Sequence, residues 1–179
     1  GREPAPGSGA AMSALREIAA QPLTSSAFAP FGEVLEIGGA PDKIINQGLC
    51  GRYHDRDALD FGPGGRAGIS LFDAEPRSLP YRLEMVERHP EGSQAFIPMH
   101  RNAWLVITAE PGTGPGGPPG AVHAFVAAPG QAINFHRGTW HGVLTPLHAP
   151  GVFAVVDRIG ESANLEEHWL EEPVLITGP

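Results

Sequence analysis

The sequence is poor in cysteine and in positive charge. Cys50 is the single cysteine among 179 residues, which excludes a disulfide within the chain. Lysine and arginine number 12 against 20 aspartates and glutamates, so the formal net charge is −8. This charge disfavours nucleic acid or an anionic membrane as a partner. Because we also recognise no secretory or membrane-spanning segment, we expect a protein of the reducing cytoplasm.

The sequence is rich in turn-forming residues instead. Its 24 glycines and 19 prolines predict about ten short strands joined by turns rather than a helical bundle. Residues 1–12 have little to bury and are expected to form a tail, and residues 13–179 to form one domain. Helix is expected at most as one turn within 22–32, begun by Ser25 or Ser26, and over 162–170, which we predict to be a short helix or irregular.

Residues 130–143 have the features of a metal-binding turn. Gly130 precedes a short strand, then a turn with His136 and Gly138, and then His141. This arrangement resembles the second motif of the cupin barrels, in which the histidine after the turn points into the barrel and usually binds a metal. The resemblance implies an all-β, cupin-type jelly-roll barrel with little helix. His136 stands where that turn normally has proline, and is either a titratable group of the site or a surface histidine.

Residues 83–98 supply the second informative pattern. In an extended strand, Glu87 and His89 share one otherwise apolar face, and Gln94 begins the next strand. A charge on such a face needs a partner or a metal. The pattern resembles the first cupin motif, usually His-x-His followed by Glu, with two of the three ligand types changed.

Two interpretations of these residues stay open. Glu87, His89, Gln94 and His141 offer nitrogen and oxygen ligands suited to one divalent ion such as Ni²⁺, Mn²⁺ or Zn²⁺. Alternatively, Glu87 and His89 form an internal hydrogen-bonded pair and catalysis proceeds without metal.

Basic side chains mark a candidate anion site. If residues 51–55 are extended, Arg52 and His54 share a face, and on the inner face of a barrel they would bind an anion. Otherwise both are solvated surface residues. Arg52 is our first choice for a fork-shaped carboxylate donor, and Arg137 is the second.

Several blocks together resemble one narrower family, the ureidoglycolate lyases. The similarity runs from about Leu23 to Ile176 and is carried, in this order, by the blocks GLCGRYHD, VERHPEGSQAFIPM, GQAINFHRGTWHGVL and VVDR. It implies a cupin homodimer that converts the small anion (S)-ureidoglycolate to glyoxylate and urea in allantoin (purine) catabolism.

That reaction removes a hydroxyl proton and protonates the departing ureido nitrogen, and histidine is the usual acid or base near neutral pH. We therefore take the catalytic candidates to be Arg52, His89, His136 and His141, and the substrate-binding candidates to be Arg52, His54, Gln94 and Arg137. Other functions stay open: a cupin module that binds or senses a small carboxylate, and an amidohydrolase that releases ammonia from ureidoglycolate. A metal-dependent dioxygenase or sugar isomerase is disfavoured by the altered first motif, since non-haem iron usually takes two histidines and a carboxylate.

Overall fold

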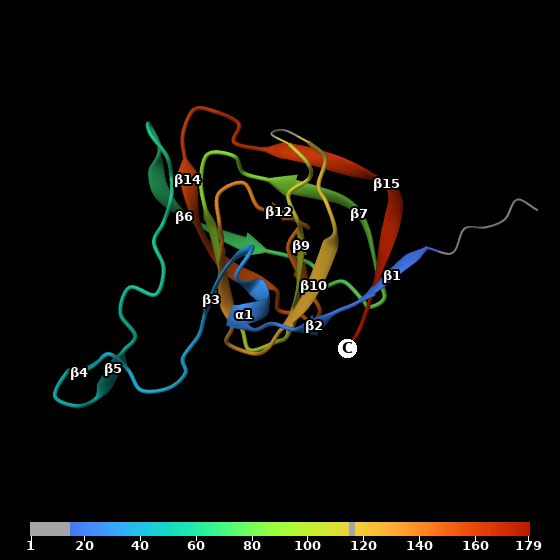
Figure 1. The fold of residues 1–179 in the computed structure, drawn as a ribbon. Coiled ribbons are helices and arrows are strands. Elements are labelled where there is room, and N and C mark those ends of the chain that lie inside the picture. Colours follow the sequence, from blue (N-terminus) through green and yellow to red (C-terminus); the bar gives the residue numbers. More distant parts are fainter. Residues whose placement is uncertain (1–14, 115–116) are drawn as a thin grey trace, which may run out of the picture.

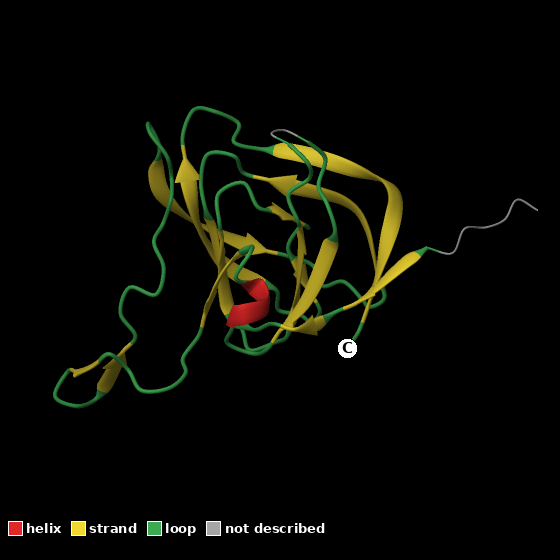
Figure 2. Cartoon of the chain, viewed as in Figure 1, coloured by secondary structure: helices red, strands yellow, loops and turns green. Residues whose placement is uncertain are grey.

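The computed structural model describes residues 15–114 and 117–179, so the predicted tail over 1–12 lies outside the described residues. The described chain is almost entirely β-structure around one short helix (Figure 2). Its elements are β1 Arg16–Ala19, β2 Gln21–Pro22, α1 Ser25–Phe28, β3 Gly32–Leu35, β4 Lys43–Ile45, β5 Cys50–Arg52, β6 Arg66–Asp73, β7 Tyr81–Arg88, β8 Gln94–Pro98, β9 Trp104–Ala109, β10 Val122–Ala127, β11 Ala132–Phe135, β12 Trp140–His141, β13 Thr145–Pro146, β14 Val152–Ile159 and β15 Glu166–Thr177.

Two large sheets form a nearly closed barrel (Figure 1). One has the strand order β1-β15-β7-β12-β9-β10-β2, with β13 also paired to β9, and the other has the order β3-β11-β8-β14-β6. This is the jelly-roll barrel of the cupins, so the predicted fold class is confirmed. No helix among the described residues is both long and apolar enough to span a membrane.

The core lies between the two sheets. Strand β9 (WLVITA) is buried along its whole length, and Ile133 and Phe153 are fully buried side chains of the facing sheet. Strands buried in this way read as nearly continuous apolar runs, which is why their positions could be recognised from the sequence.

Helix α1 closes one end of the core. Its Phe28 is fully buried and packs edge-on against Phe125, at 5.7 Å between ring centroids, and Phe31 is buried beside it. The helix begins at Ser25, one of the two predicted starts. Thr24, not Ser25 or Ser26, caps the helix, because its hydroxyl accepts the Ala27 N–H at 3.2 Å and satisfies a free helix donor.

The C-terminal strand corrects a second prediction. Residues 166–170 continue into β15, where a helix or an irregular segment was expected, and β15 pairs with β7 with a change of register between Trp169 and Val174. Most side chains of its first half are exposed, so a strong apolar alternation that would have revealed the strand is missing.

Strands β4 and β5 form a small sheet of their own, separate from the barrel sheets. We call residues 38–56 the arm, and it projects away from the barrel (Figure 1). Its tip turns at Asn46, Gln47 and Gly48, all of which have positive φ. An isolated two-stranded hairpin is at best marginally stable in water, so the arm needs support beyond its own strand pairing.

We predict that Leu83→Ala lowers the free energy of unfolding by about 2–5 kcal/mol, because it leaves a cavity at a core position. Leu83 is 1% exposed, whereas Leu59 is 44% exposed, so Leu59→Ala is the matched control and should cost under about 1 kcal/mol. Urea unfolding followed by circular dichroism measures both, and equal losses would contradict this assignment of the core.

Candidate functional site

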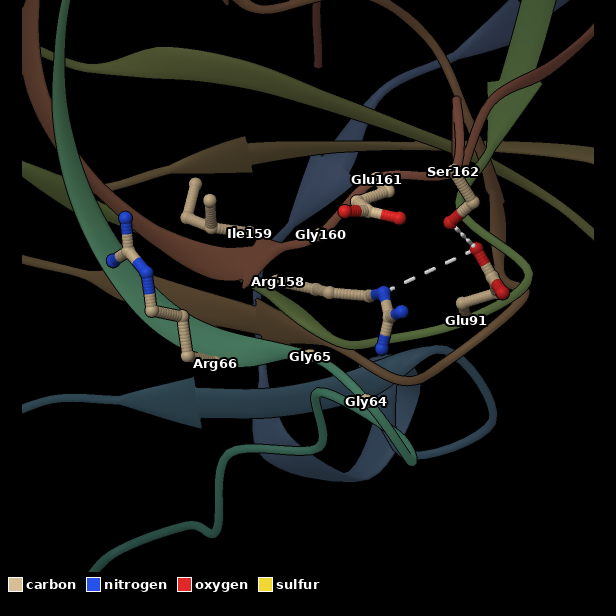
Figure 3. A pocket seen from close by; sticks show the side chains of 9 residues that line it. All are labelled: Gly64, Gly65, Arg66, Glu91, Arg158, Ile159, Gly160, Glu161 and Ser162. Carbon is tan, nitrogen blue, oxygen red and sulfur yellow. Dashed lines mark hydrogen bonds and ion pairs between the residues drawn. The ribbon is translucent and has the colours of Figure 1, made fainter.

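A cavity of about 440 Å³ opens between the two sheets. Its walls include Glu87 from β7, Gln94 from β8 and Asp157 from β14, together with His89 just after β7. A wider cavity of about 600 Å³ adjoins it, because both are lined by Arg158, Ile159, Gly160 and Ser162 (Figure 3). The two cavities therefore meet at the end of β14 and the loop that follows it.

Glu87 and His89 line the smaller cavity, and the buried His141 lies beside them. One ligand atom from each of the three lies within 4.8 Å of the others. Strand pairing brings them together, since His141 on β12 pairs directly with Glu87 on β7, and the rings of His89 and His141 have centroids 5.2 Å apart. The predicted link between the two sequence motifs is therefore present in the structure.

The two imidazoles are held in the same way. His89 Nδ1 bonds to the Asn164 carbonyl at 2.9 Å, and His141 Nδ1 bonds to the Gly142 carbonyl at 2.9 Å. A carbonyl only accepts, so each Nδ1 carries a proton. In the neutral form of each ring, the lone pair is then on Nε2. Both Nε2 atoms are buried and have no hydrogen-bond partner among the described residues. Two buried ring nitrogens without hydrogen-bond partners are suited to bind a cation.

Burial also sets the protonation of this centre. Desolvation lowers the pKa of His141 to about 3, and the neighbouring His89 adds to this effect while the Gly142 carbonyl opposes it. Burial raises the pKa of Glu87, partly opposed by His89 and reinforced by Glu167. His141 is therefore neutral near pH 7, and an ionised Glu87 gains from a positive charge beside it.

Gln94 lines the same cavity as Glu87 and His89. Its Nε2 donates to Asp157 Oδ2 at 3.0 Å, which fixes the orientation of the amide. Its Oε1 is buried without a partner among the described residues. Two imidazole nitrogens, a carboxylate and an amide oxygen suit a borderline divalent ion.

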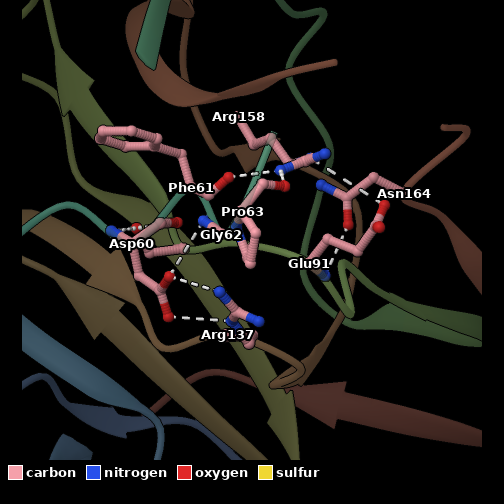
Figure 4. Close-up of polar contacts among 9 residues, drawn as sticks. Asp60, Phe61, Gly62, Pro63, Glu91, Arg137, Arg158 and Asn164 are labelled. Carbon is pink, nitrogen blue, oxygen red and sulfur yellow. Dashed lines mark hydrogen bonds and ion pairs between the residues drawn. The ribbon is translucent and has the colours of Figure 1, made fainter. Parts of the chain in front are cut away.

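The loops around the cavity are tied together by Arg158 and Asn164 (Figure 4). The Arg158 side chain is 6% exposed and donates to the carbonyls of Phe61 and Pro63. Asn164 accepts the Glu91 N–H at 2.8 Å through Oδ1, in addition to fixing His89. These bonds hold the segments after β5, β7 and β14 around the site.

His136 and Arg137 lie elsewhere. Both are exposed and line a separate cavity with Phe31 and Thr139. The Arg137 guanidinium forms two bonds to Asp60, Nε to Oδ2 at 2.9 Å and NH2 to Oδ1 at 2.6 Å (Figure 4). The structure therefore does not bring His136 into the site with His141, and it engages Arg137 in a structural ion pair.

Arg52 and His54 are also outside the cavity of their own chain. They lie on the arm, where Arg52 NH2 bonds to His54 Nδ1 at 2.6 Å. The expectation that they share a side is met, and within one copy the second of the two alternatives holds, because both are exposed surface residues.

Asp157, Arg158 and Asn164 were not predicted as site residues. The sequence did contain a signal for Asp157. Side chains alternate along a strand, so Asp157 shares a face of β14 with Phe153 and Val155, which are fully buried. Asn164 carried no comparable signal, since it lies in a loop and contacts His89 through its backbone carbonyl.

Comparison with known proteins agrees with this geometry. The sequence model of the family described as Ureidoglycolate lyase matches residues 15–177. The chain is 53% identical to the ureidoglycolate lyase of Rhodobacter capsulatus over 164 residues, which is 92% of this chain and 100% of that protein. It is 48% identical to ureidoglycolate lyase 2 of Rhizobium meliloti (86% of this chain, 93% of that protein) and 43% identical to the ureidoglycolate lyase of Pseudomonas aeruginosa (88% and 93%).

The low pKa of His141 predicts how metal-free protein responds to acid. Below the ordinary histidine pKa of 6.5, the unfolded chain takes up a proton that the folded chain refuses. The free energy of unfolding should thus fall by about 2 kcal/mol between pH 6.5 and pH 5 from this group.

Urea titrations at several pH values, after removal of metal with a chelator, measure this effect. His141→Gln removes the group and should flatten the profile, whereas His148→Gln, at an exposed position, should leave it unchanged. A wild-type profile as flat as that of His141→Gln would contradict the assignment.

Proposed function

The chain belongs to the ureidoglycolate lyase family and is an enzyme of the lyase class, and we propose that it cleaves (S)-ureidoglycolate into glyoxylate and urea in the cavity of His89 and His141. The observation that carries the proposal is the grouping of Glu87, His89 and His141, of which one ligand atom each lies within 4.8 Å of the others. The Nε2 atoms of both histidines are buried without a hydrogen-bond partner among the described residues. In the reaction, the hydroxyl loses its proton, the carbon–oxygen bond becomes a carbonyl, the carbon–nitrogen bond breaks, and the ureido nitrogen gains a proton. No water is consumed.

The site residues fit a divalent ion such as Ni²⁺, Mn²⁺ or Zn²⁺, held by Glu87, His89 and His141 with Gln94 Oε1 as a fourth ligand. Such an ion supplies a Lewis acid that stabilises negative charge on a substrate oxygen. Support comes from the carbonyl bonds at both Nδ1 atoms, which is how proteins commonly orient metal-binding histidines. Burial raises the pKa of Glu87 and so disfavours its ionised form. A bound cation would offset this cost, because a nearby positive charge favours the ionised carboxylate.

Asp157 is our choice for the proton transfer. It lies in the same cavity but outside this ligand set, and Gln94 holds one of its oxygens. The carboxylate accepts the hydroxyl proton and returns it to the departing nitrogen, so the chemistry is balanced within one group. Arg158 lines the cavity and adds positive charge that favours an anionic substrate.

We also propose that the protein is a homodimer and works in the cytoplasm. The lone Cys50, a free thiol, supports a reducing compartment. The dimer is supported by exposed apolar side chains on one sheet face.

The assay that tests the function follows three products. Purified protein is incubated with (S)-ureidoglycolate, with and without chelator, and then with added Ni²⁺, Mn²⁺ or Zn²⁺. Glyoxylate and urea should form in equal amounts, and chelation should abolish turnover until metal is restored. Ammonia in place of urea would identify the amidohydrolase instead, and binding without turnover at every metal loading would identify the carboxylate-binding module.

We predict that Asp157→Asn lowers kcat by about 100-fold or more, since it removes the proton acceptor, with a smaller effect on KM. His141→Ala should lower kcat by a similar factor and also reduce the metal content measured by plasma mass spectrometry. His148→Ala, at an exposed position, is the control for both. Wild-type kcat in Asp157→Asn would remove Asp157 from the mechanism.

A further inference from the structure

The arm exposes apolar side chains that its own chain does not cover. Ile44 is 63% exposed and Leu49 is 88% exposed. Among the described residues, the hydrogen bonds and ion pairs of the arm stay within it, for example Tyr53 to the Gly39 carbonyl at 2.8 Å and Arg56 to Asp42 at 3.0 Å. Since a lone hairpin with an apolar surface gains little in water, the arm is built to contact another surface.

The same chain carries an uncovered apolar surface on its barrel. Ile69 and Leu71 of β6 are 78% and 68% exposed. Ile97 of β8 is 41% exposed, and Met99, just after β8, is 57% exposed. Leu71 pairs with Ala154, and Ala154 pairs with Ile97, so these side chains stand in one row on one face of the sheet. We call this surface, defined by Ile69, Leu71, Ile97 and Met99, the outer face.

The outer face lies next to the cavity. Strand β6 is the edge strand of its sheet. Leu71 points to the outer face, and its neighbour Phe72 lines the cavity with Glu87 and His89. A segment that packs on the outer face and passes the β6 edge therefore arrives at the cavity mouth.

The arm also carries Arg52, which has no carboxylate partner among the described residues of its own chain. Arg52 and His54 are exposed, and the Arg52 guanidinium makes one hydrogen bond to a described residue, through NH2 to His54. Arg158, which lines the cavity, already donates to two backbone carbonyls. An anionic substrate would therefore gain from the unused donors of Arg52.

We propose that a second copy of this chain covers the outer face, and that each arm places Arg52 and His54 at the cavity mouth of the other copy. The arm and the outer face are both uncovered within one copy, yet one chain carries both. Two copies related by a two-fold axis satisfy both surfaces at once. The eight residues from Gly38 to Ile45 span up to about 25 Å when extended, which is enough to cross a sheet edge. Arg52 then binds the substrate carboxylate, a role that rests on the proposed function.

Sedimentation velocity tests the interface independently of catalysis. The wild type should be a dimer at micromolar concentration, and Leu49→Asp on the arm or Ile69→Asp on the outer face should each give folded monomers, because a charge would be buried without a partner. Trp169→Asp, at a 65% exposed side chain of β15 in the other sheet, is the control and should stay dimeric. A monomeric wild type, or dimers of unchanged affinity in both arm and face variants, would overturn the proposal.

Subunit complementation tests whether the site is shared. Arg52→Ala and His141→Gln homodimers should each lose activity, the first mainly through a KM raised by about 10- to 100-fold. A heterodimer of the two, purified with two different tags, has one site with both changes and one with neither. It should therefore recover about half of the wild-type activity, as expected for two equivalent sites related by a two-fold axis.

An inactive heterodimer would place Arg52 outside the partner's site and overturn the shared-site proposal. Asp157→Asn replaces His141→Gln if the latter is poorly folded. If the wild type itself lacks turnover of ureidoglycolate, the proposed function fails, and the sedimentation result still decides the arm contact.

Discussion

The candidate site depends on one constraint, which is that two neighbouring imidazoles have their Nδ1 atoms engaged by backbone carbonyls and their Nε2 atoms buried without a partner among the described residues. His141 is neutral near pH 7, because desolvation lowers its pKa to about 3. Its Nε2 and that of His89 are both buried without a hydrogen-bond partner among the described residues, and buried polar atoms of that kind are costly unless something pairs with them. The neighbouring Glu87 has the opposite difficulty, a charge that burial disfavours. One divalent cation bound between them, as we propose, would satisfy all three groups.

The strands of the barrel hold these side chains in place. Register between β12 and β7 sets His141 opposite Glu87, and the sheet containing β8 and β14 sets Gln94 opposite Asp157. Phe135 stacks on the His141 ring at 4.5 Å between centroids and nearly parallel, at 9°, so the imidazole is fixed by packing as well as by hydrogen bonding. A binding site is preorganised when the side chains that contact the ligand are held rigidly and each histidine is held in one tautomer.

Much of this was accessible from the sequence, for physical reasons. Glycine and proline frequency, short apolar runs and the spacing around His141 predicted the β-barrel, and strand alternation placed Glu87 and His89 together. The roles of His136 and Arg137 could not be judged, because the turn after β11 directs them away from the cavity and Arg137 meets Asp60, which is 77 residues away in the chain. Arg52 and His54 were correctly paired, but a local pattern does not reveal that the hairpin leaves the barrel. The contact of Asn164 with His89 could not be predicted, since it is made by a backbone carbonyl in a loop, which has no sequence signature.

The central claim, that the two Nε2 atoms and Glu87 hold a divalent ion, is tested most directly by X-ray absorption at the metal edge of protein loaded with Zn²⁺. The account predicts two imidazole nitrogens at about 2.0–2.1 Å together with oxygen ligands at about 2.0–2.2 Å, and the loss of one imidazole in His141→Gln. A spectrum with no imidazole scattering, or one unchanged by His141→Gln, would contradict it.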